Sequence, residues 1–231
     1  MTISVKKRNG DTASLDLERV HHIVEHACNG LAGVSESAVE MNSGLQFFDG
    51  IETKDIQEIL IRSANDLITL DNPNYQFVAA RLLLFALRKS VYKGHPDNHP
   101  TLKKHVKKCI DLKVYDSEIL TKYTDEEWDV LNSYIDHDRD YLFTYAGMRQ
   151  VCDKYLVQDR SNGEIFETPQ FMYIMIAATL FQDDDKFYRL DYIKKYYDAI
   201  SKHKINIPTP VMAGVRTPIR QFASCVLVDL D

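Results

Sequence analysis

The chain has 231 residues, of which 45% are apolar and 27% charged, and its formal net charge at pH 7 is −6. This length and composition predict a soluble globular protein with a substantial core, holding one large domain or two small ones. The acidic balance argues against a general nucleic-acid binder, which needs a strongly basic face, but a local basic patch is enough for a nucleotide site.

The first residues predict a β-hairpin that leads into a helix. Ile3, Val5 and Lys7 alternate with Lys6 and Arg8, and Asn-Gly at 9–10 is a strong two-residue turn signal. Residues 13–17 form the returning strand. We expect Asp16 to cap the helix that follows. Cys28 lies on the apolar stripe of this helix, which favours a core thiol over a reactive one.

Three more helices are predicted before residue 94. The pattern from Ser37 to Glu40 is typical of a capping box at the start of a short second helix, and Thr53 opens a third. A turn at residues 71–74 precedes a fourth helix, whose segment 77–87 is apolar on most sides and therefore central. The hairpin and four helices have about the minimum size of an independent domain, and residues 95–100 resemble its exit linker.

Beyond this linker the chain is expected to stay mainly helical. A capping box from Thr124 to Glu127 and the Thr168-Pro169 pair mark two helix starts, and the apolar run after Pro169 should be buried. A second hairpin is predicted between residues 155–157 and 164–166. The other predicted helices lie near residues 102–110, 143–156 and 187–202. The last of these is amphipathic, with Leu190, Ile193, Tyr197 and Ile200 expected to face inward. Residues 222–230 read as a strand that is apolar on both faces.

The cysteines and the N-terminus indicate the compartment. The four cysteines are far apart and form no CxxC motif, which argues against a zinc site and gives no support to a secreted disulfide framework. No signal peptide is recognisable, and the most apolar run, residues 171–181, is too short to span a bilayer. We expect a cytoplasmic protein that associates with neither membranes nor nucleic acid.

Two charged regions allow a plain structural interpretation. The basic clusters at residues 6–8 and 103–108 are, from residue type alone, most often solvated faces. Residues 136–140 place three carboxylates around His137, a set that can suggest a metal site. They lie in one short stretch and would point in different directions, so ion pairs at a surface or between domains are the preferred interpretation, and we expect no metal bound by this chain.

Several segments of the first ninety residues together resemble the ATP-cone, a small regulatory domain of ribonucleotide reductases that binds ATP or dATP. The segments are Val5-Lys6-Lys7-Arg8-Asn9-Gly10, Leu17-Glu18-Arg19-Val20, Thr53-x-Asp55-Ile56 and Ala79-Ala80-Arg81 to Arg88-Lys89. Lysines and arginines at a hairpin turn and a helix end can neutralise a triphosphate, and Thr53 at a helix start adds a hydroxyl beside backbone N–H groups.

The resemblance implies a set of effector-binding residues for ATP or dATP with Mg²⁺. By position in the family pattern these are Lys7, Ala13, Ser14, Leu15, Asp16, Leu17, Glu18, Arg19, Thr53 and Lys89. Ala13 and Ser14 stand where relatives often carry larger polar or charged residues, so backbone contacts are what carries over there.

A second resemblance lies near the end of the sequence. Residues 205–210, Ile-Asn-Ile-Pro-Thr-Pro, and the stretch from Gly214 to Ser224-Cys225-Val226-Leu227 resemble the segment of the class I ribonucleotide reductase large subunit that begins its ten-stranded α/β barrel. Prolines on both sides of Thr209 fix the backbone and would hold its hydroxyl toward a diphosphate. From residue type alone Cys225 would be a buried, inert thiol; the resemblance implies a redox-active one.

The resemblance covers the whole chain and implies its fold and domains. We expect a mainly α protein with small β-hairpins: an ATP-cone at residues 1–94, a helical domain at 95–204, and the first strand of an incomplete ten-stranded α/β barrel at 205–231.

The resemblance also implies a reaction. In this family Thr209 and Ser224 would contact a ribonucleoside diphosphate, and a thiyl radical abstracts the 3′ hydrogen of the ribose. Two further thiols, one at the Cys225 position, reduce the substrate as the 2′ hydroxyl leaves, and thioredoxin or glutaredoxin restores them. The radical originates in a di-iron tyrosyl centre on a partner small subunit.

The family's radical-forming cysteine, second redox thiol and C-terminal shuttle cysteines are all expected downstream of Asp231. We therefore expect the chain alone to be inactive and to work with a C-terminal portion of the large subunit, as the product of a split gene or of truncation, within an assembly that is a homodimer. The alternative, from another class, is a non-enzymatic ATP/dATP sensor that regulates a partner; residues 1–90 fit both, and only the segment from Thr209 to Cys225 separates them.

Overall fold

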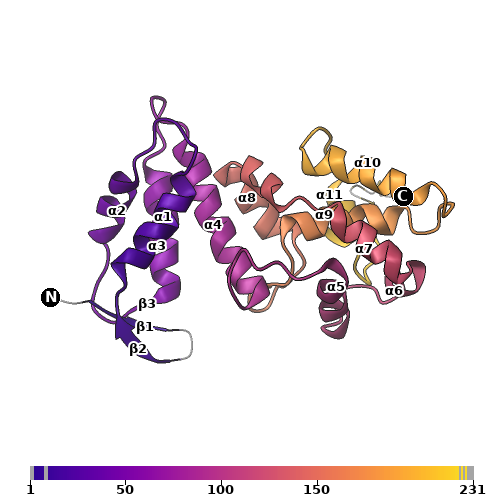
Figure 1. Cartoon of the computed structure of the whole chain (residues 1–231), viewed down its shortest axis with the longest axis horizontal. Helices are drawn as coiled ribbons and strands as arrows, with labels where there is room; N and C mark the ends of the chain where they lie inside the picture. Colours follow the sequence, from indigo (N-terminus) through magenta and orange to yellow (C-terminus); the bar gives the residue numbers. More distant parts are fainter. Residues whose placement is uncertain (1–2, 8–9, 224, 226, 228–231) are drawn as a thin grey trace. The chain divides into compact units, whose positions relative to one another are not determined.

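A computed structural model of the chain describes residues 3–7, 10–223, 225 and 227. Its elements fall into two compact units. The first runs to Ala86 and includes Tyr141–Arg149, and the second holds Leu87–Asp140 and continues from Gln150. Both are mainly helical (Figure 1), as the sequence predicts.

The first unit combines a small sheet with helices. Its elements are β1 (Ser4–Lys6), β2 (Thr12–Ser14), α1 (Leu17–Cys28), α2 (Glu36–Gly44), β3 (Ile51–Glu52), α3 (Thr53–Asp66), the first part of α4 (Tyr75–Tyr92) and most of α8 (Tyr145–Gln150). The sheet has the order β2-β1-β3. The predicted hairpin is confirmed, because β1 and β2 pair antiparallel with Val5 opposite Ala13.

Local capping decides where the helices of this unit begin. The Asp16 side chain accepts a hydrogen bond from the Arg19 backbone N–H at 3.0 Å, so the predicted cap of α1 is confirmed. The predicted capping box at Ser37 is wrong, because Ser35 is the N-cap of α2 and its hydroxyl accepts from the Ala38 N–H at 3.2 Å. Ser37 therefore lies inside the first turn of α2.

The second unit is built around one apolar helix. Its elements are the end of α4, α5 (Leu102–Asp111), α6 (Ile119–Lys122), α7 (Asp125–Ser133), most of the 3-10 helix η1 (His137–Leu142), the π-helix η2 (Val151–Tyr155), β4 (Gln158–Asp159), β5 (Glu164–Ile165), α9 (Pro169–Leu180), α10 (Arg189–Ser201) and α11 (Thr209–Gly214). Every residue of α9 from Pro169 to Ala178 is buried, as predicted. Helix α10 packs on α9 through Ile193, Tyr197 and Ile200.

Two helix starts in this unit follow the sequence. The Thr124 hydroxyl accepts from the Glu127 N–H at 3.3 Å, and the Glu127 carboxylate accepts from the Thr124 N–H at 2.8 Å, so the capping box is confirmed. Pro169 occupies the first turn of α9, with Thr168 before it. The Thr168 hydroxyl makes no cap hydrogen bond and instead pairs with the Tyr92 hydroxyl at 3.2 Å.

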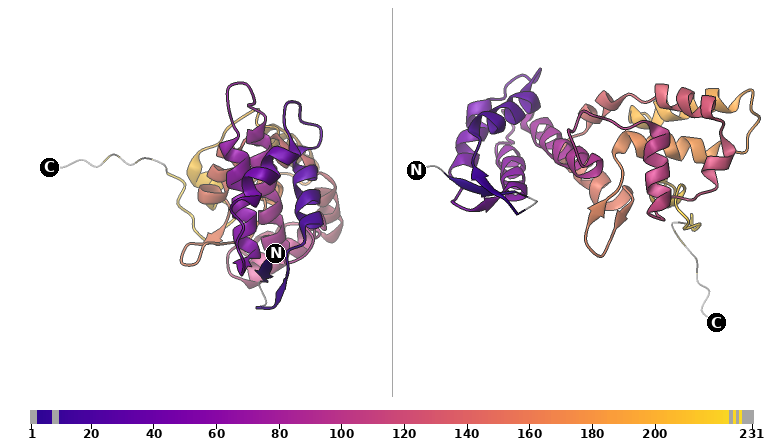
Figure 2. Two further views of the ribbon diagram at one scale, coloured as in Figure 1. Left: turned by 90° about the vertical axis from the view of Figure 1, so that its left-hand side faces the viewer. Right: turned by 60° about the horizontal axis from the view of Figure 1, so that its bottom comes forward.

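The predicted single helix over residues 143–156 is wrong, because α8 gives way to the π-helix η2 at Val151. Wider backbone hydrogen bonds appear there, with the Leu156 N–H donating to the Val151 carbonyl at 3.0 Å. The Gln158 amide satisfies the Cys152 carbonyl at 2.9 Å. A hairpin follows, as predicted, but its first strand lies at Gln158–Asp159 instead of residues 155–157, with Gln158 opposite Ile165. The hairpin extends beyond the helices of the unit in Figure 2.

The predicted strand at residues 222–230 has no counterpart among the residues that the structure describes. Residues 222, 223, 225 and 227 carry no strand assignment, and the others of that segment lie outside the described residues. A strand is defined by its partner, so the barrel strand stays a prediction. Within the described ranges no helix is long and apolar enough to cross a membrane.

Candidate functional site

Two of the predicted effector-binding residues lie at the same end of the small sheet. Strands β1 and β3 run parallel with Lys6 opposite Glu52, so the residues that follow, Lys7 and Thr53, continue from the same edge. Lys7 is exposed and Thr53 is half-buried. The fold therefore brings an ammonium group and a hydroxyl to the N-terminus of α3.

This helix N-terminus is suited to an anion. Helix α3 begins at Thr53, and its N-cap residue Glu52 makes no side-chain cap hydrogen bond. The first N–H groups of α3 thus lack the side-chain acceptor that Asp16 supplies to α1, and a helix N-terminus with unsatisfied N–H groups favours phosphate. Lys54 pairs with Glu52 at 3.2 Å, which offsets the negative charge beside the site.

The remaining effector residues continue from the neighbouring strand. Ala13 and Ser14 lie in β2 opposite Val5 and Ser4, and the Leu15 N–H donates to the Ile3 carbonyl at 2.8 Å. Asp16 is the cap of α1, and the first turn of that helix is exposed at Leu17, Glu18 and Arg19. Lys89 lies in the last turn of α4, in the second unit, and its part in a nucleotide site stays a prediction.

The prolines around Thr209 lie at the start of α11, a short helix that was not predicted from the sequence. Pro208 is the N-cap of α11, Thr209 is its first residue and Pro210 follows in the first turn. The Pro208 carbonyl accepts from the N–H groups of Val211 at 3.0 Å and Met212 at 3.1 Å. Proline fixes φ at two of three successive positions, so the backbone around the exposed Thr209 hydroxyl is held in one conformation.

Exposure separates Cys225 from the other three thiols. Cys225 is exposed, whereas Cys28, Cys109 and Cys152 are buried. Burial raises the pKa of Cys28 to about 11 and that of Cys109 to about 12, which makes both thiols unreactive at neutral pH. Cys28 is a core thiol, as predicted. Ser224 lies outside the described residues.

Arg216, which lies between Thr209 and Cys225 in the sequence, forms a buried ion pair with Glu167 that sequence reasoning missed. Glu167 and Arg216 have side-chain exposures of 0% each. The Arg216 Nε donates to Glu167 Oε2 at 2.8 Å, and its Nη2 donates to Oε1, so the pair is bidentate. The Tyr115 hydroxyl donates to the same carboxylate, and burial together with the Glu167 charge raises the pKa of Tyr115 well above its usual value. The only local sign of this pair in the sequence is that a charged residue, Glu167, stands next to Thr168 at the start of an apolar helix.

Two of the three carboxylates at residues 136–140 form ion pairs. Asp140 accepts from Arg88 Nη2 at 3.0 Å and from the Gln170 amide at 2.8 Å, and Asp136 pairs with Arg139 at 3.2 Å. The salt-bridge interpretation is thus confirmed for Asp136 and Asp140. Among the described residues no group of three His, Cys, Asp or Glu side chains is arranged to hold a metal ion.

Comparison with known families matches both parts of the chain. The ATP cone domain family matches residues 3–90, and the family described as the ribonucleotide reductase all-alpha domain matches residues 141–220. The second match includes α11 and the Arg216 segment and ends shortly before Cys225.

Curated relatives match the chain over almost its whole length. It is 50% identical over 230 residues to the ribonucleoside-diphosphate reductase subunit alpha of Haemophilus influenzae, covering 100% of this chain and 30% of that protein. It is 48% identical to the Escherichia coli K12 ribonucleoside-diphosphate reductase 1 subunit alpha, covering 97% of this chain and 29% of the relative. The enterobacteria phage T4 subunit is 41% identical, with 98% and 30% covered. The chain spans about a third of the length of these relatives. The chain belongs to the ribonucleotide reductase large-subunit family and corresponds to the N-terminal part of its class I members, with an ATP cone followed by the all-alpha domain.

Proposed function

We propose that the chain contributes the allosteric nucleotide site, the substrate contacts Thr209 and Ser224, and the redox thiol Cys225 of a ribonucleoside-diphosphate reductase. The observation that carries the proposal is the segment from Thr209 to Cys225. It combines a proline-fixed, exposed hydroxyl with an exposed thiol, in a chain whose other thiols are buried. A purely regulatory sensor has no use for such a segment.

The proposed reaction replaces the 2′ hydroxyl of a ribonucleoside diphosphate with hydrogen. Two thiols give two electrons and two protons, the hydroxyl leaves as water, and the thiols end as a disulfide. Cys225 is one of these thiols, and the second is supplied by the remaining part of the large subunit. Thioredoxin or glutaredoxin then reduces the disulfide by thiol exchange, for which the exposure of Cys225 is favourable.

The effector site is proposed at the end of the small sheet where Lys7 and Thr53 meet. A triphosphate there would receive the charge of Lys7, the Thr53 hydroxyl and the N-terminal N–H groups of α3. The residues present fit ATP or dATP, whose accompanying Mg²⁺ would neutralise phosphate charge when bound. The backbone of Ala13 and Ser14 would border the ligand from β2.

The catalytic part of the proposal is tested by reconstitution. The chain is mixed with the remaining part of the large subunit, the radical-bearing small subunit, thioredoxin and a ribonucleoside diphosphate, and deoxynucleotide formation is measured. Cys225→Ser should lower the rate by at least about a hundredfold, because a hydroxyl cannot form the disulfide. Cys28→Ala, which removes a buried thiol of the first unit, is the matched control. Equal activity of Cys225→Ser and the control would refute the catalytic assignment.

The regulatory part is tested by calorimetry of the intact chain with ATP and dATP. Lys7→Gln and Thr53→Val should each weaken binding about fivefold or more, since each removes a contact to a charged phosphate. Lys195→Gln is the control, because this lysine is exposed in α10 of the second unit. Absence of binding by the unmodified chain would count against a live effector site and would leave the Cys225 test unaffected.

A further inference from the structure

Glu167 is a buried carboxylate whose two oxygens are both fully used. Its Oε1 accepts from Arg216 Nη2 and from the Val157 backbone N–H, the latter at 2.6 Å. Its Oε2 accepts from Arg216 Nε at 2.8 Å and from the Tyr115 hydroxyl. A buried charge pair contributes little net stability, but breaking one is costly, so a pair of this kind fixes geometry more than it adds stability.

Arg216 uses its other donors on two backbone carbonyls. Its Nη1 donates to the Met212 carbonyl at 2.5 Å, and its Nη2 donates to the Tyr155 carbonyl at 3.0 Å. Met212 lies in α11, which begins at Thr209, and Tyr155 ends the π-helix η2. The guanidinium therefore ties α11 to the hairpin region of the helical unit. A lysine could not do this, because one ammonium group cannot span two carbonyls and a carboxylate in fork geometry.

The chain after Arg216 is held by a second set of contacts. The Asp116 N–H donates to the Arg216 carbonyl at 3.0 Å. Arg220 then pairs with Asp116 at 2.5 Å and with Glu118 at 3.0 Å. Two successive arginines thus fasten the segment to the same stretch between α5 and α6, and Cys225 follows five residues beyond the second of them.

We propose that Arg216, held by Glu167, is a positioning residue. It fixes the helix that begins at Thr209 relative to the segment that leads to Cys225. The proposal rests on the proposed function of Thr209 and Cys225. Arg216 itself touches no substrate. It acts through its hydrogen bonds to the Met212 and Tyr155 carbonyls. Its loss should therefore change the geometry between the Thr209 hydroxyl and the Cys225 thiol.

A second buried arginine provides the matched control. Arg189 has a side-chain exposure of 3% and makes a bidentate pair with Glu127, with its Nε donating at 3.0 Å. It also donates to the Gln182 carbonyl at 3.2 Å, and its guanidinium lies 4.5 Å from the ring centroid of Tyr123. Arg189→Lys therefore removes comparable buried contacts in the same unit, but from helices that carry no residue of the proposed site.

The first measurement is amide hydrogen exchange in the intact chain. Arg216→Lys keeps a cation beside Glu167 but loses the carbonyl contacts. The protection of the Met212, Val215 and Thr217 amides, which bond within residues 208–217, should fall at least about tenfold. Protection in α10 should stay within about twofold. Arg189→Lys should give the reverse pattern. Unchanged protection at residues 208–217 in Arg216→Lys would overturn the proposal.

The second measurement is turnover in the reconstituted reductase, expressed per folded chain. Arg216→Lys should lower kcat about tenfold or more and raise the KM for the nucleoside diphosphate, whereas Arg189→Lys should keep both within about twofold. Similar losses in the two variants would reduce Arg216 to a structural residue. If Arg216→Lys turned over normally while Cys225→Ser was inactive, the positioning role of Arg216 would be refuted and the proposed function would stand. An active Cys225→Ser enzyme would instead refute the proposed function.

Discussion

Lowering the pH from 7 to 5 should destabilise the second unit, because its core holds histidines in the neutral form. His105 stacks on Phe171 with ring centroids 4.3 Å apart, and His137 meets the edge of the same ring at 5.3 Å. His99 stacks on His137 at 3.7 Å. Burial lowers the pKa of His105 and of His137 to about 3, and nearby cations such as Arg88 act in the same direction on His137.

The sign follows from proton uptake. An unfolded imidazole with an ordinary pKa of about 6.5 binds a proton between pH 7 and pH 5, whereas the folded His105 and His137 do not. The contribution of the two neutral histidines to stability is fully present above the pKa of the unfolded imidazole, and it is lost as the pH falls below that value. The free energy of unfolding should drop by about 2 kcal/mol for each of these two histidines.

Asp140 opposes this trend. Burial raises the pKa of Asp140 to about 6 despite the Arg88 contact, so the folded carboxyl takes up a proton between pH 7 and pH 5. This uptake raises the free energy of unfolding by about 1 kcal/mol. The net loss for the unit is therefore about 3 kcal/mol. His99, whose pKa burial lowers to about 4, adds to the loss, but it is only half-buried and solvent screens its effect.

Urea unfolding followed by tryptophan fluorescence measures this effect in the right unit. The single tryptophan, Trp128, is buried in α7 of the second unit with an exposure of 1%. With a slope of about 2 kcal/mol per molar urea, the midpoint should fall by about 1.5 M from pH 7 to pH 5. His105→Phe should reduce the shift by about two thirds, because His105 supplies about 2 of the net 3 kcal/mol. His22→Gln, at an exposed position, should leave the shift unchanged. A midpoint that is constant or rises on acidification would refute the reasoning.

Three further predictions concern helix capping, the core and thiol access. Thr124→Ala removes the hydroxyl that accepts from the Glu127 N–H and should lower the free energy of unfolding of the second unit by about 1 kcal/mol, measured by the same urea titration. Leu131→Ala truncates a side chain with 0% exposure and should cost about 3 kcal/mol in that assay. Under native conditions an aromatic disulfide reagent should label Cys225 at least about a hundredfold faster than the three buried thiols, as followed by peptide mass spectrometry; comparable rates would show that their burial is transient.

Local signals sufficed where a helix end is decided by residues close in sequence. Asp16 and the pair Thr124 and Glu127 were identified because the donor and acceptor lie three residues apart. Ser35 and Ser37 are equally good caps by type, and the choice between them involves a distant residue. The Ser35 N–H donates to the Tyr75 hydroxyl at 2.9 Å, across 40 residues, so the sequence pattern alone selected the wrong serine.

The same limit applies to the candidate site. Thr209 and Cys225 were recognisable because each sits in a local pattern of residue types. The pairing of Glu167 with Arg216 spans 49 residues and joins two residues that, read singly, are ordinary surface charges. The π-helix at Val151 was missed for a similar reason, since the carbonyl that it frees is satisfied by Gln158 from the following hairpin.

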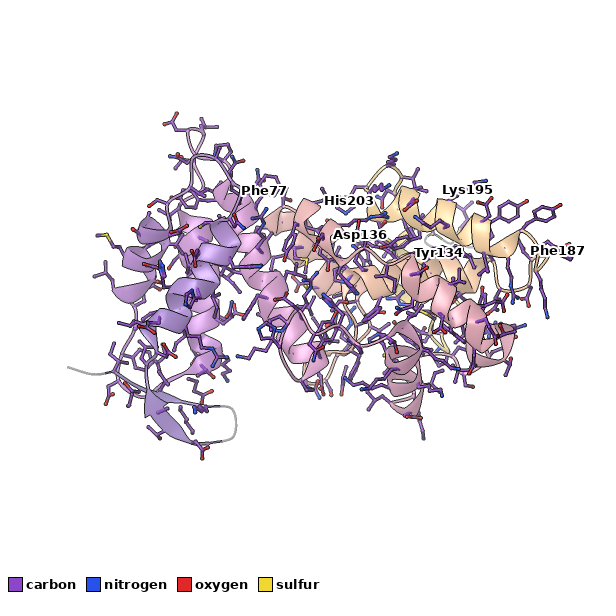
Figure 3. The ribbon with its side chains drawn as sticks, in the orientation of Figure 1. Phe77, Tyr134, Asp136, Phe187, Lys195 and His203 are labelled. Atoms are coloured by element: carbon purple, nitrogen blue, oxygen red, sulfur yellow. The ribbon has the colours of Figure 1, made fainter. Side chains whose placement is uncertain are left out.

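Surface aromatic residues also escaped the sequence pattern. The last amphipathic helix is predicted to begin at Phe187, but α10 begins at Arg189. The Phe187 side chain is 91% exposed and points outward in Figure 3. Of the side chains predicted to face inward, those of Ile193, Tyr197 and Ile200 are buried and that of Leu190 is half-buried. Helical spacing identified the buried face, but the first turn depended on the Asp185 carbonyl that caps it through the Arg189 N–H at 2.9 Å.

The two candidate sites differ in how much of their geometry the described residues supply. Lys7 and Thr53 are brought together by strand pairing within the first unit, so nucleotide binding can be tested on the chain alone. The ion pairs of Arg220 with Asp116 and Glu118 anchor the chain five residues before Cys225. Testing the thiol, in contrast, needs the remaining part of a reductase. An enzyme assembled in this way would position its reducing thiol through Glu167, Arg216 and Tyr115, buried residues that take no part in the chemistry themselves. Substitutions at Glu167 or Tyr115 should therefore impair reduction while leaving effector binding intact.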